Sequence, residues 1–173
     1  MLPCLHKTRI PTNYLQIMAT LFLLSGLPGT GKTTLAKQLE QASSTVRLTP
    51  DEWLYPLLKD VTDKAELDRL RVPTEAVQWE LAKKLLSLGI NVILDWGFWS
   101  REQRAVYRRE AEAIGAQVEF RFFEVNRDEL INRLTVRNIA AAPGTFNVTE
   151  AELDRWIPWY EPPHGDELSF CQV

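Results

Sequence analysis

Eight consecutive residues near the N-terminus carry the clearest chemical pattern in the sequence. They read GLPGTGKT, from Gly26 to Thr33, and match the phosphate-binding pattern G-x-x-x-x-G-K-[ST] at every fixed position. Glycines let successive backbone N–H groups turn inward around a phosphate, and the start of the next helix adds partial positive charge. We therefore expect ATP or GTP to bind here. The residues expected to hold the nucleotide are Gly26, Pro28, Gly29, Thr30, Gly31, Lys32, Thr33 and Thr34.

Two side chains of this loop have distinct expected tasks. Lys32 would reach the β- and γ-phosphates with its ammonium group, and Thr33 would offer its hydroxyl to Mg²⁺. The flanking sequence agrees with this prediction, because a short apolar run precedes the loop and a helical pattern follows it, at residues 20–25 and 32–41. A chance glycine turn before a helix is the alternative, and it does not explain this context.

Two carboxylates follow predicted strands. Asp51 comes after a weak second strand, residues 45–48, and Asp95 ends a buried third strand, residues 91–95. Ligands of open parallel sheets bind outside the carboxyl ends of the strands. Asp95 is therefore expected to hold Mg²⁺, through water, or to orient an acceptor, unless it is a plain strand-end carboxylate. Asp51 either faces the γ-phosphate or caps a helix.

Strand-like and helix-like segments alternate along the chain. Strands separated by helices of this length need crossover connections, which predicts a parallel sheet with helices on both faces. We expect a three-layer α/β/α P-loop NTPase fold with five parallel strands in the order 2-3-1-4-5. A fourth strand is predicted at residues 116–125 and a fifth at 168–173, while a short helix at 63–71 precedes a separate one that Pro73 opens.

Length, charge and cysteine content bound the possibilities. The 173 residues suggest one domain, 19–173, after a flexible extension, 1–18, that an upstream start codon could also explain. A net charge of −3 argues against a nucleic-acid partner, because such proteins need a basic face. No apolar run reaches membrane-spanning length, and two isolated thiols, Cys4 and Cys171, fit the reducing cytoplasm. A monomer or a homodimer is expected.

Three classes of nucleotide-dependent protein compete for this pattern. A GTPase switch would carry D-x-x-G after the third strand and N-K-x-D for guanine, whereas Trp96, Gly97 and Phe98 follow Asp95 and no N-K-x-D exists. A mechanical ATPase would place a glutamate after the strand-end aspartate to activate water. A kinase needs neither device, so the sequence favours phosphoryl transfer to a small acceptor.

Five segments together resemble the P-loop kinases related to polynucleotide kinase, zeta toxins, chloramphenicol phosphotransferase and the shikimate and gluconate kinases. They are SGLPGTGKTTLA, LTPDEW, VILDWGFWSREQR, EVNRDELINRLTVRN and WYEPP, and the similarity covers nearly all of residues 19–173. The narrower resemblance is to short bacterial "AAA domain" proteins of that group. It implies an ATP:Mg²⁺ site but fixes no substrate.

The resemblance gives further residues a role. It implies that Asp51 accepts the proton of the acceptor hydroxyl, and that Arg133 and Arg137 belong to a lid, around residues 127–147, that closes on the phosphates. An ion pair of Glu129 with Arg133, beside a solvated Arg137, is the alternative. Polynucleotide kinase has an arginine shortly after its aspartate, whereas this chain has Leu54, Tyr55 and Pro56, which counts against a polynucleotide acceptor.

Some residues near these carboxylates stay open between two interpretations. Aromatic rings suit stacking on a sugar, nucleoside or drug-like ring, and core packing explains them equally well; they are Trp53, Trp96, Phe98 and Trp99. Arg101 and Arg104 either read an anionic acceptor or lie on the surface.

The sequence thus predicts an ATP-dependent kinase that phosphorylates a hydroxyl of a small molecule. A nucleoside or nucleic-acid 5′-hydroxyl kinase and a non-catalytic nucleotide-binding regulator are the alternatives.

Overall fold

The computed structural model describes residues 18–58, 64–140 and 145–170. Residues 1–17 of the expected N-terminal extension, residues 141–144 of the expected lid and the last three residues lie outside these ranges. Four parallel strands form the sheet in the order β2-β3-β1-β4, which confirms the first four positions of the predicted order. The strands are β1 (Thr20–Ser25), β2 (Thr45–Leu48), β3 (Asn91–Gly97) and β4 (Gln117–Phe122).

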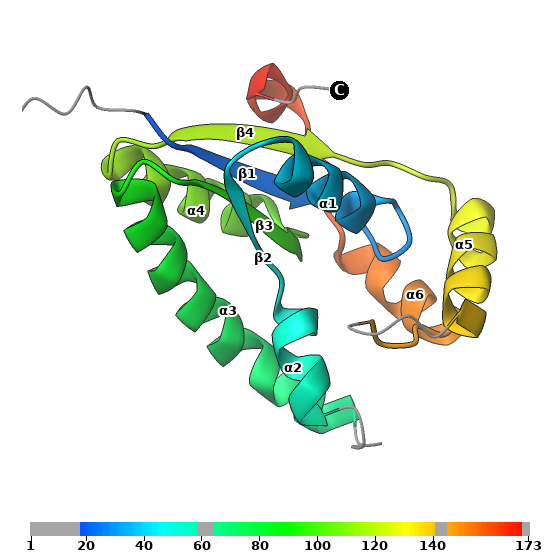
Figure 1. Cartoon of the computed structure of the whole chain (residues 1–173). Coiled ribbons are helices and arrows are strands. Elements are labelled where there is room, and N and C mark those ends of the chain that lie inside the picture. The colour runs from blue at the N-terminus through cyan, green and yellow to red at the C-terminus, as the bar shows by residue number, and fades with distance from the viewer. Residues whose placement is uncertain (1–17, 59–63, 141–144, 171–173) are drawn as a thin grey trace, which may run out of the picture.

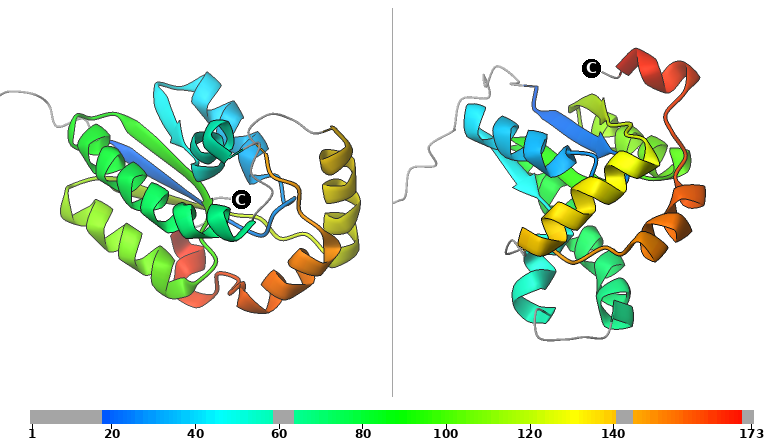
Figure 2. Two further views of the ribbon diagram at one scale, coloured as in Figure 1. Left: turned by 90° about the horizontal axis from the view of Figure 1, so that it is seen from below. Right: turned by 90° about the vertical axis from the view of Figure 1, so that its right-hand side faces the viewer.

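Helices cover both faces of this sheet, so the three-layer prediction is confirmed (Figures 1 and 2). Helix α1 (Lys32–Ala42) packs Ala36 against Leu24 and Ile93 on one face. Helices α3 (Lys64–Ser87) and α4 (Arg101–Ala113) cover the other face, where Trp79 and Ala111 join the largest apolar cluster. Both clusters draw on alternate residues of the same strands, as expected for a sheet buried on two sides.

The predicted fifth strand is wrong for the part that the structure describes. Gly165–Phe170 form a 3₁₀ helix, η2, beside β4, while residues 171–173 lie outside the described ranges. Two arginines of α4 hold the start of this segment, because Arg101 binds Asp166 at 2.6 Å and Arg104 binds Glu167 at 2.7 Å. These ion pairs join the 3₁₀ helix to α4.

The predicted break at Pro73 is also wrong, because α3 runs through it as one helix. Proline lacks the N–H that would donate to the Arg69 carbonyl four residues earlier, so the helix continues through Pro73 without that hydrogen bond. The first half of α3 packs against α2 (Pro50–Leu58), away from the sheet (Figure 1). Tertiary packing thus holds together two segments that local propensity would separate.

The last helices form a separate apolar cluster near the phosphate loop. Helix α5 (Arg127–Ala140) contributes Leu130 and Leu134, and α6 (Glu150–Trp156) contributes Leu153, all against Leu27. A short 3₁₀ helix, η1 (Ile157–Trp159), follows α6. A capping box starts α6, with Thr149 and Glu152 exchanging hydrogen bonds. Within the described ranges, no helix combines the length and apolar character that crossing a membrane requires.

Candidate nucleotide and acceptor site

The predicted phosphate loop lies between β1 and α1, and its glycines have the backbone that the motif requires. Gly26 has φ 150° and donates its N–H to the Gly97 carbonyl at 2.9 Å, which joins the loop to the end of β3. A Cβ on Gly29, where φ is 86°, would lie 3.1 Å from Leu134 of α5. The loop is therefore closely packed between β3 and α5.

Lys32 folds back over this loop. Its Nζ donates to the Leu27 carbonyl at 2.7 Å and to the Thr30 hydroxyl at 3.2 Å. Burial lowers the pKa of Lys32 to about 8, with Asp95 opposing the effect and Arg137 adding to it. An ammonium group with so low a pKa gains strongly from a bound phosphate, because the anion replaces the lost hydration.

Asp95 lies on β3 with its side chain only 3% exposed. Burial raises the pKa of Asp95, against the opposing influence of the Thr33 hydroxyl, Lys32 and Arg47. Its Oδ2 atom is buried and has no hydrogen-bond partner within the described ranges. A carboxylate oxygen without a donor, close to a threonine hydroxyl, fits the oxygen ligands that Mg²⁺ prefers. These residues therefore suit the expected magnesium ion.

Arg47 is a site residue that the sequence did not reveal. Its side chain is 7% exposed and bridges Glu40 at 3.2 Å and Glu52 at 2.7 Å, while its Nη1 lies 3.9 Å from Asp95. The guanidinium is thus largely neutralised by carboxylates. In the sequence, only the position of Arg47 in the short strand before Asp51 could have indicated that it belongs to the site.

Asp51 lies in the first turn of α2, with its side chain 40% exposed. Its Oδ1 accepts a hydrogen bond from Arg71 of α3 at 2.7 Å, a contact across twenty residues that the sequence analysis missed. The charge of Asp51 also acts on Lys32 and Asp95. The structure therefore brings Asp51, Lys32 and Asp95 to one end of the sheet, although three different elements carry them.

The two predicted lid arginines lie in different surroundings. Arg133 is about half exposed and pairs with Glu129 at 2.7 Å, which is the alternative left open above. Arg137 is partly buried. Its positive charge lowers the pKa of Lys32, and the negative charge of Asp51 in turn stabilises the charged form of Arg137. Burial lowers the pKa of Arg137, and its Nε has no hydrogen-bond partner among the described residues. Of these two arginines, Arg137 is therefore the one that lies beside the phosphate loop with an N–H group, Nε, that donates to no described residue.

Phe146 connects this arginine to the acceptor side. Arg137 donates to the Phe146 carbonyl at 3.2 Å, and Asn138 of α5 donates to the Val148 carbonyl at 2.7 Å. The Phe146 ring lies 6.0 Å from the ring of Tyr55 on α2. Phe146 thus contacts both α5 and α2 across the site.

One face of α3 adds three polar residues that the sequence analysis did not single out. Arg71, Glu75 and Gln78 are spaced by four and three residues, which places them on the same side of the helix. Burial raises the pKa of Glu75 to about 7, with Arg71 opposing the effect and Asp51 adding to it. The spacing indicates in the sequence that these three residues share one face of a helix. That this face is directed toward Asp51 follows from the contact between Arg71 and Asp51 in the structure.

The aromatic residues divide between core and surface. Trp96 stacks on Phe98 at 5.6 Å and donates from Nε1 to Gln78, while Trp99 packs against Trp156 of α6. Trp53 is 39% exposed on α2. Packing therefore accounts for Trp96, Phe98 and Trp99.

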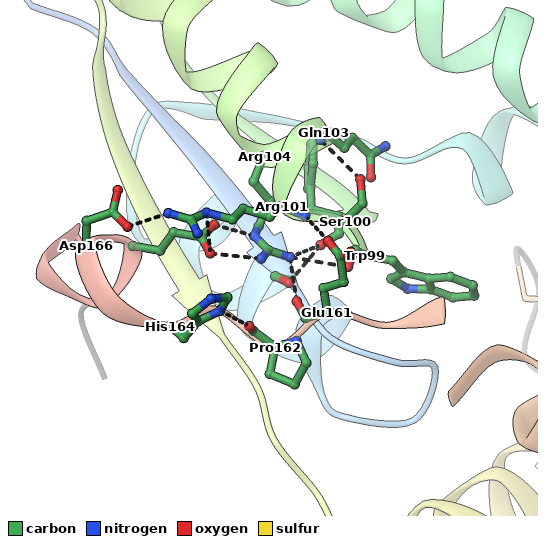
Figure 3. Close-up of polar contacts among 12 residues, drawn as sticks. Trp99, Ser100, Arg101, Gln103, Arg104, Glu161, Pro162, His164 and Asp166 are labelled. Carbon is green, nitrogen blue, oxygen red and sulfur yellow. Dashed lines mark hydrogen bonds and ion pairs between the residues drawn. The ribbon is translucent and has the colours of Figure 1, made fainter. Parts of the chain in front are cut away.

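Arg101 and Arg104 serve the C-terminal segment (Figure 3). Arg104 is 2% exposed and binds the carboxylate of Glu167, and its Nη1 donates to the Glu161 carbonyl at 2.8 Å and to the Phe98 carbonyl at 3.2 Å. Arg101 binds Asp166. The structure thus contradicts a surface position for Arg104, which is a buried anchor, and the described contacts give neither arginine to an acceptor.

A parallel sheet in this order, with a G-x-x-x-x-G-K-[ST] loop at the end of its first strand, defines a P-loop kinase-like protein. Residues 21–163 match the family described as "AAA domain", and the chain belongs to that family. No curated protein matches the chain.

Solved structures share the fold at low sequence identity. A candidate kinase from Chloroflexus aurantiacus superposes with a TM-score of 0.66 and 19% identity, over 82% of this chain and 75% of that one. Kti12 of Chaetomium thermophilum, in complex with ADP-AlF3, superposes with a TM-score of 0.59 and 17% sequence identity, over 83% of this chain and 81% of that one. A gluconokinase from Sinorhizobium meliloti 1021 superposes with a TM-score of 0.58 and 16% sequence identity, over 89% of this chain and 79% of that one. At these identities the likeness concerns the fold.

Proposed function

We propose that the protein is an ATP-dependent phosphotransferase that moves the γ-phosphate to a hydroxyl of a small molecule. The observation that carries this proposal is the convergence of Lys32, Asp51, Asp95 and Arg137, from four different elements, at the carboxyl end of the sheet. A site that only binds nucleotide needs the loop and its lysine. It does not need a carboxylate on α2 held by a partner on α3.

Each residue has a definable task in this reaction. The loop amides and Lys32 bind the phosphates, and Arg137 offsets charge on the transferring group. Thr33 and Asp95 would hold Mg²⁺, which neutralises phosphate charge when bound. Asp51 orients the acceptor hydroxyl and takes its proton late in the transfer. The 2.7 Å hydrogen bond from Arg71 holds the Asp51 carboxylate in a fixed position.

Asp51→Asn tests this assignment. The protein is incubated with γ-labelled ATP, Mg²⁺ and a cell metabolite extract, and labelled products are separated and identified by mass spectrometry. We expect transfer to fall by about 10²–10⁴-fold, as for loss of a general base, while ATP binding persists. Asp128→Asn is the control, because the Asp128 side chain is 94% exposed on α5.

Two outcomes contradict the proposal. Normal transfer by Asp51→Asn would reduce Asp51 to a structural residue at the start of α2. ATP binding by the wild-type protein without transfer to any component of the extract would indicate a non-catalytic nucleotide-binding regulator.

A further inference from the structure

The face of α3 next to Asp51 determines what kind of acceptor the site receives. Arg71 contacts Asp51 directly, and Glu75 and Gln78 follow one and two turns later on the same face. The charge of Glu75 acts on Tyr107 of α4, and burial together with this charge raises the pKa of Tyr107 to about 12. Glu75 therefore interacts electrostatically with both the proposed base, Asp51, and Tyr107 of α4.

This face offers hydrogen-bond donors and acceptors in alternation. Gln78 accepts from Trp96 Nε1 at 2.9 Å, and its Nε2 is buried with no hydrogen-bond partner in the described part of the chain. Glu75 contributes a partly buried carboxyl group and Arg71 a guanidinium. A buried amide without a partner is costly, and because Gln78 is fully buried, an acceptor oxygen could satisfy it only if this part of the site opened. Several hydroxyl groups on one molecule match such a mixed set.

The charges of the residues around the proposed acceptor position, next to Asp51, add up to zero or to a negative value. Asp51 and Arg71 compensate each other, and Glu75 adds no charge when protonated and a negative charge when ionised. The neighbouring cation, Arg47, is bound by Glu40 and Glu52. The charge of Asp51 also acts on Lys32 and Arg137, and in the proposed reaction the nucleotide phosphates engage both of these cations.

A negatively charged acceptor would therefore lose its hydration without gaining, among the described residues, a cation that a carboxylate or the nucleotide phosphates do not already engage. Desolvating an unpaired anion is strongly unfavourable, and a second negative charge next to Asp51 and the γ-phosphate adds repulsion. An uncharged molecule avoids both costs, and an amino group would gain from Glu75.

We propose that the acceptor is a polyhydroxyl compound without negative charge, uncharged or amino-bearing, and that Arg71 and Glu75 bind its hydroxyl groups. This inference rests on the proposed function and names its substrate class. It makes Glu75 a specificity-determining residue.

The test separates acceptors by charge before the reaction. A metabolite extract is passed over an anion exchanger at pH 7.5, and the retained and unretained fractions are each incubated with the protein, γ-labelled ATP and Mg²⁺. We expect labelled product from the unretained fraction, which holds uncharged and cationic molecules. Product from the retained fraction alone, which holds carboxylates, phosphates and oligonucleotides, would overturn the inference and leave the proposed function intact. Product from neither fraction would refute the proposed function as well.

A variant pair then tests the residue. With the acceptor from the unretained fraction, Glu75→Gln is expected to raise the KM for the acceptor about tenfold, the scale of one hydrogen bond to a charged or strongly polar group, with the KM for ATP unchanged. Glu80→Gln, at an exposed position on the same helix, is the matched control. Equal KM values in both variants would show that Glu75 does not contact the acceptor.

Discussion

Glu75→Gln has a consequence for stability that does not depend on any acceptor. Burial moves the pKa of Glu75 from its ordinary value of 4.5 to about 7 in the folded protein. When the pKa of a carboxyl group is higher in the folded than in the unfolded protein, the folded state binds the proton more tightly. The group then stabilises the fold fully at a pH below its unfolded pKa, and this stabilisation is lost as the pH rises to the folded pKa. Glutamine does not titrate, so the variant lacks this loss.

The size of the effect follows from that pKa interval. Each pKa unit of difference corresponds to about 1.4 kcal/mol, so the interval sets an upper bound of about 3.5 kcal/mol, and partial exposure of Glu75 reduces the expected value to about 2 kcal/mol. The free energy of unfolding of Glu75→Gln, relative to wild type, should therefore rise by this amount between about pH 4.5 and 7.5. For a chain of this length that corresponds to roughly 4–8 °C in melting temperature.

Urea unfolding of both proteins, at several pH values across this interval, measures the difference directly. Groups that titrate in both proteins cancel in the comparison. Glu80→Gln should give a flat difference, because its side chain is 66% exposed. A flat profile for Glu75→Gln too would refute the buried position assigned to this carboxyl.

Three further predictions concern other parts of the site. Arg137→Ala should lower kcat more than ATP affinity, whereas Arg133→Ala should have a small effect because Arg133 pairs with Glu129 at the surface; equal kinetics in both variants would contradict this difference. ATP affinity should be constant from pH 6 to 7.5 and weaken above about pH 8, as free Lys32 loses its proton, and a flat titration calorimetry profile to pH 9.5 would disprove it. Arg104→Met should lower the free energy of unfolding by about 3 kcal/mol and Arg101→Met by less than about 1 kcal/mol, and urea unfolding with the reverse order would contradict the buried anchor.

The phosphate loop and the sheet order were predictable because their signals are local. The glycine spacing, Lys32 and the apolar run of β1 lie within a few residues of one another, and they indicate a P-loop NTPase fold, whose strand order was then expected here. The end of the chain was not predictable in this way. Residues 168–173 have a strand-like composition, but the side-chain contacts of Arg104 with Glu167, across 63 residues, join the 3₁₀ helix Gly165–Phe170 to α4.

The acceptor side was predictable in part. Asp51 was found from its place after a strand, but its partner Arg71 lies on a helix that was expected to end there. Local propensity separates the segments before and after Pro73, and only the packing of α2 on α3 keeps them in one helix. Glu75 and Gln78 are ordinary polar residues in the sequence, and their burial becomes visible once that helix is placed.

Binding of ATP·Mg²⁺ to Lys32→Ala, measured by titration calorimetry at pH 7, tests the central claim most directly. The wild-type protein and Lys37→Ala, which changes an exposed lysine of the same helix, should bind with similar affinity. Lys32→Ala should bind at least about tenfold more weakly, because it loses a charge-assisted contact to the phosphates. Equal affinity in all three proteins, or no binding by the wild type, would contradict a phosphate site at Gly26–Thr33.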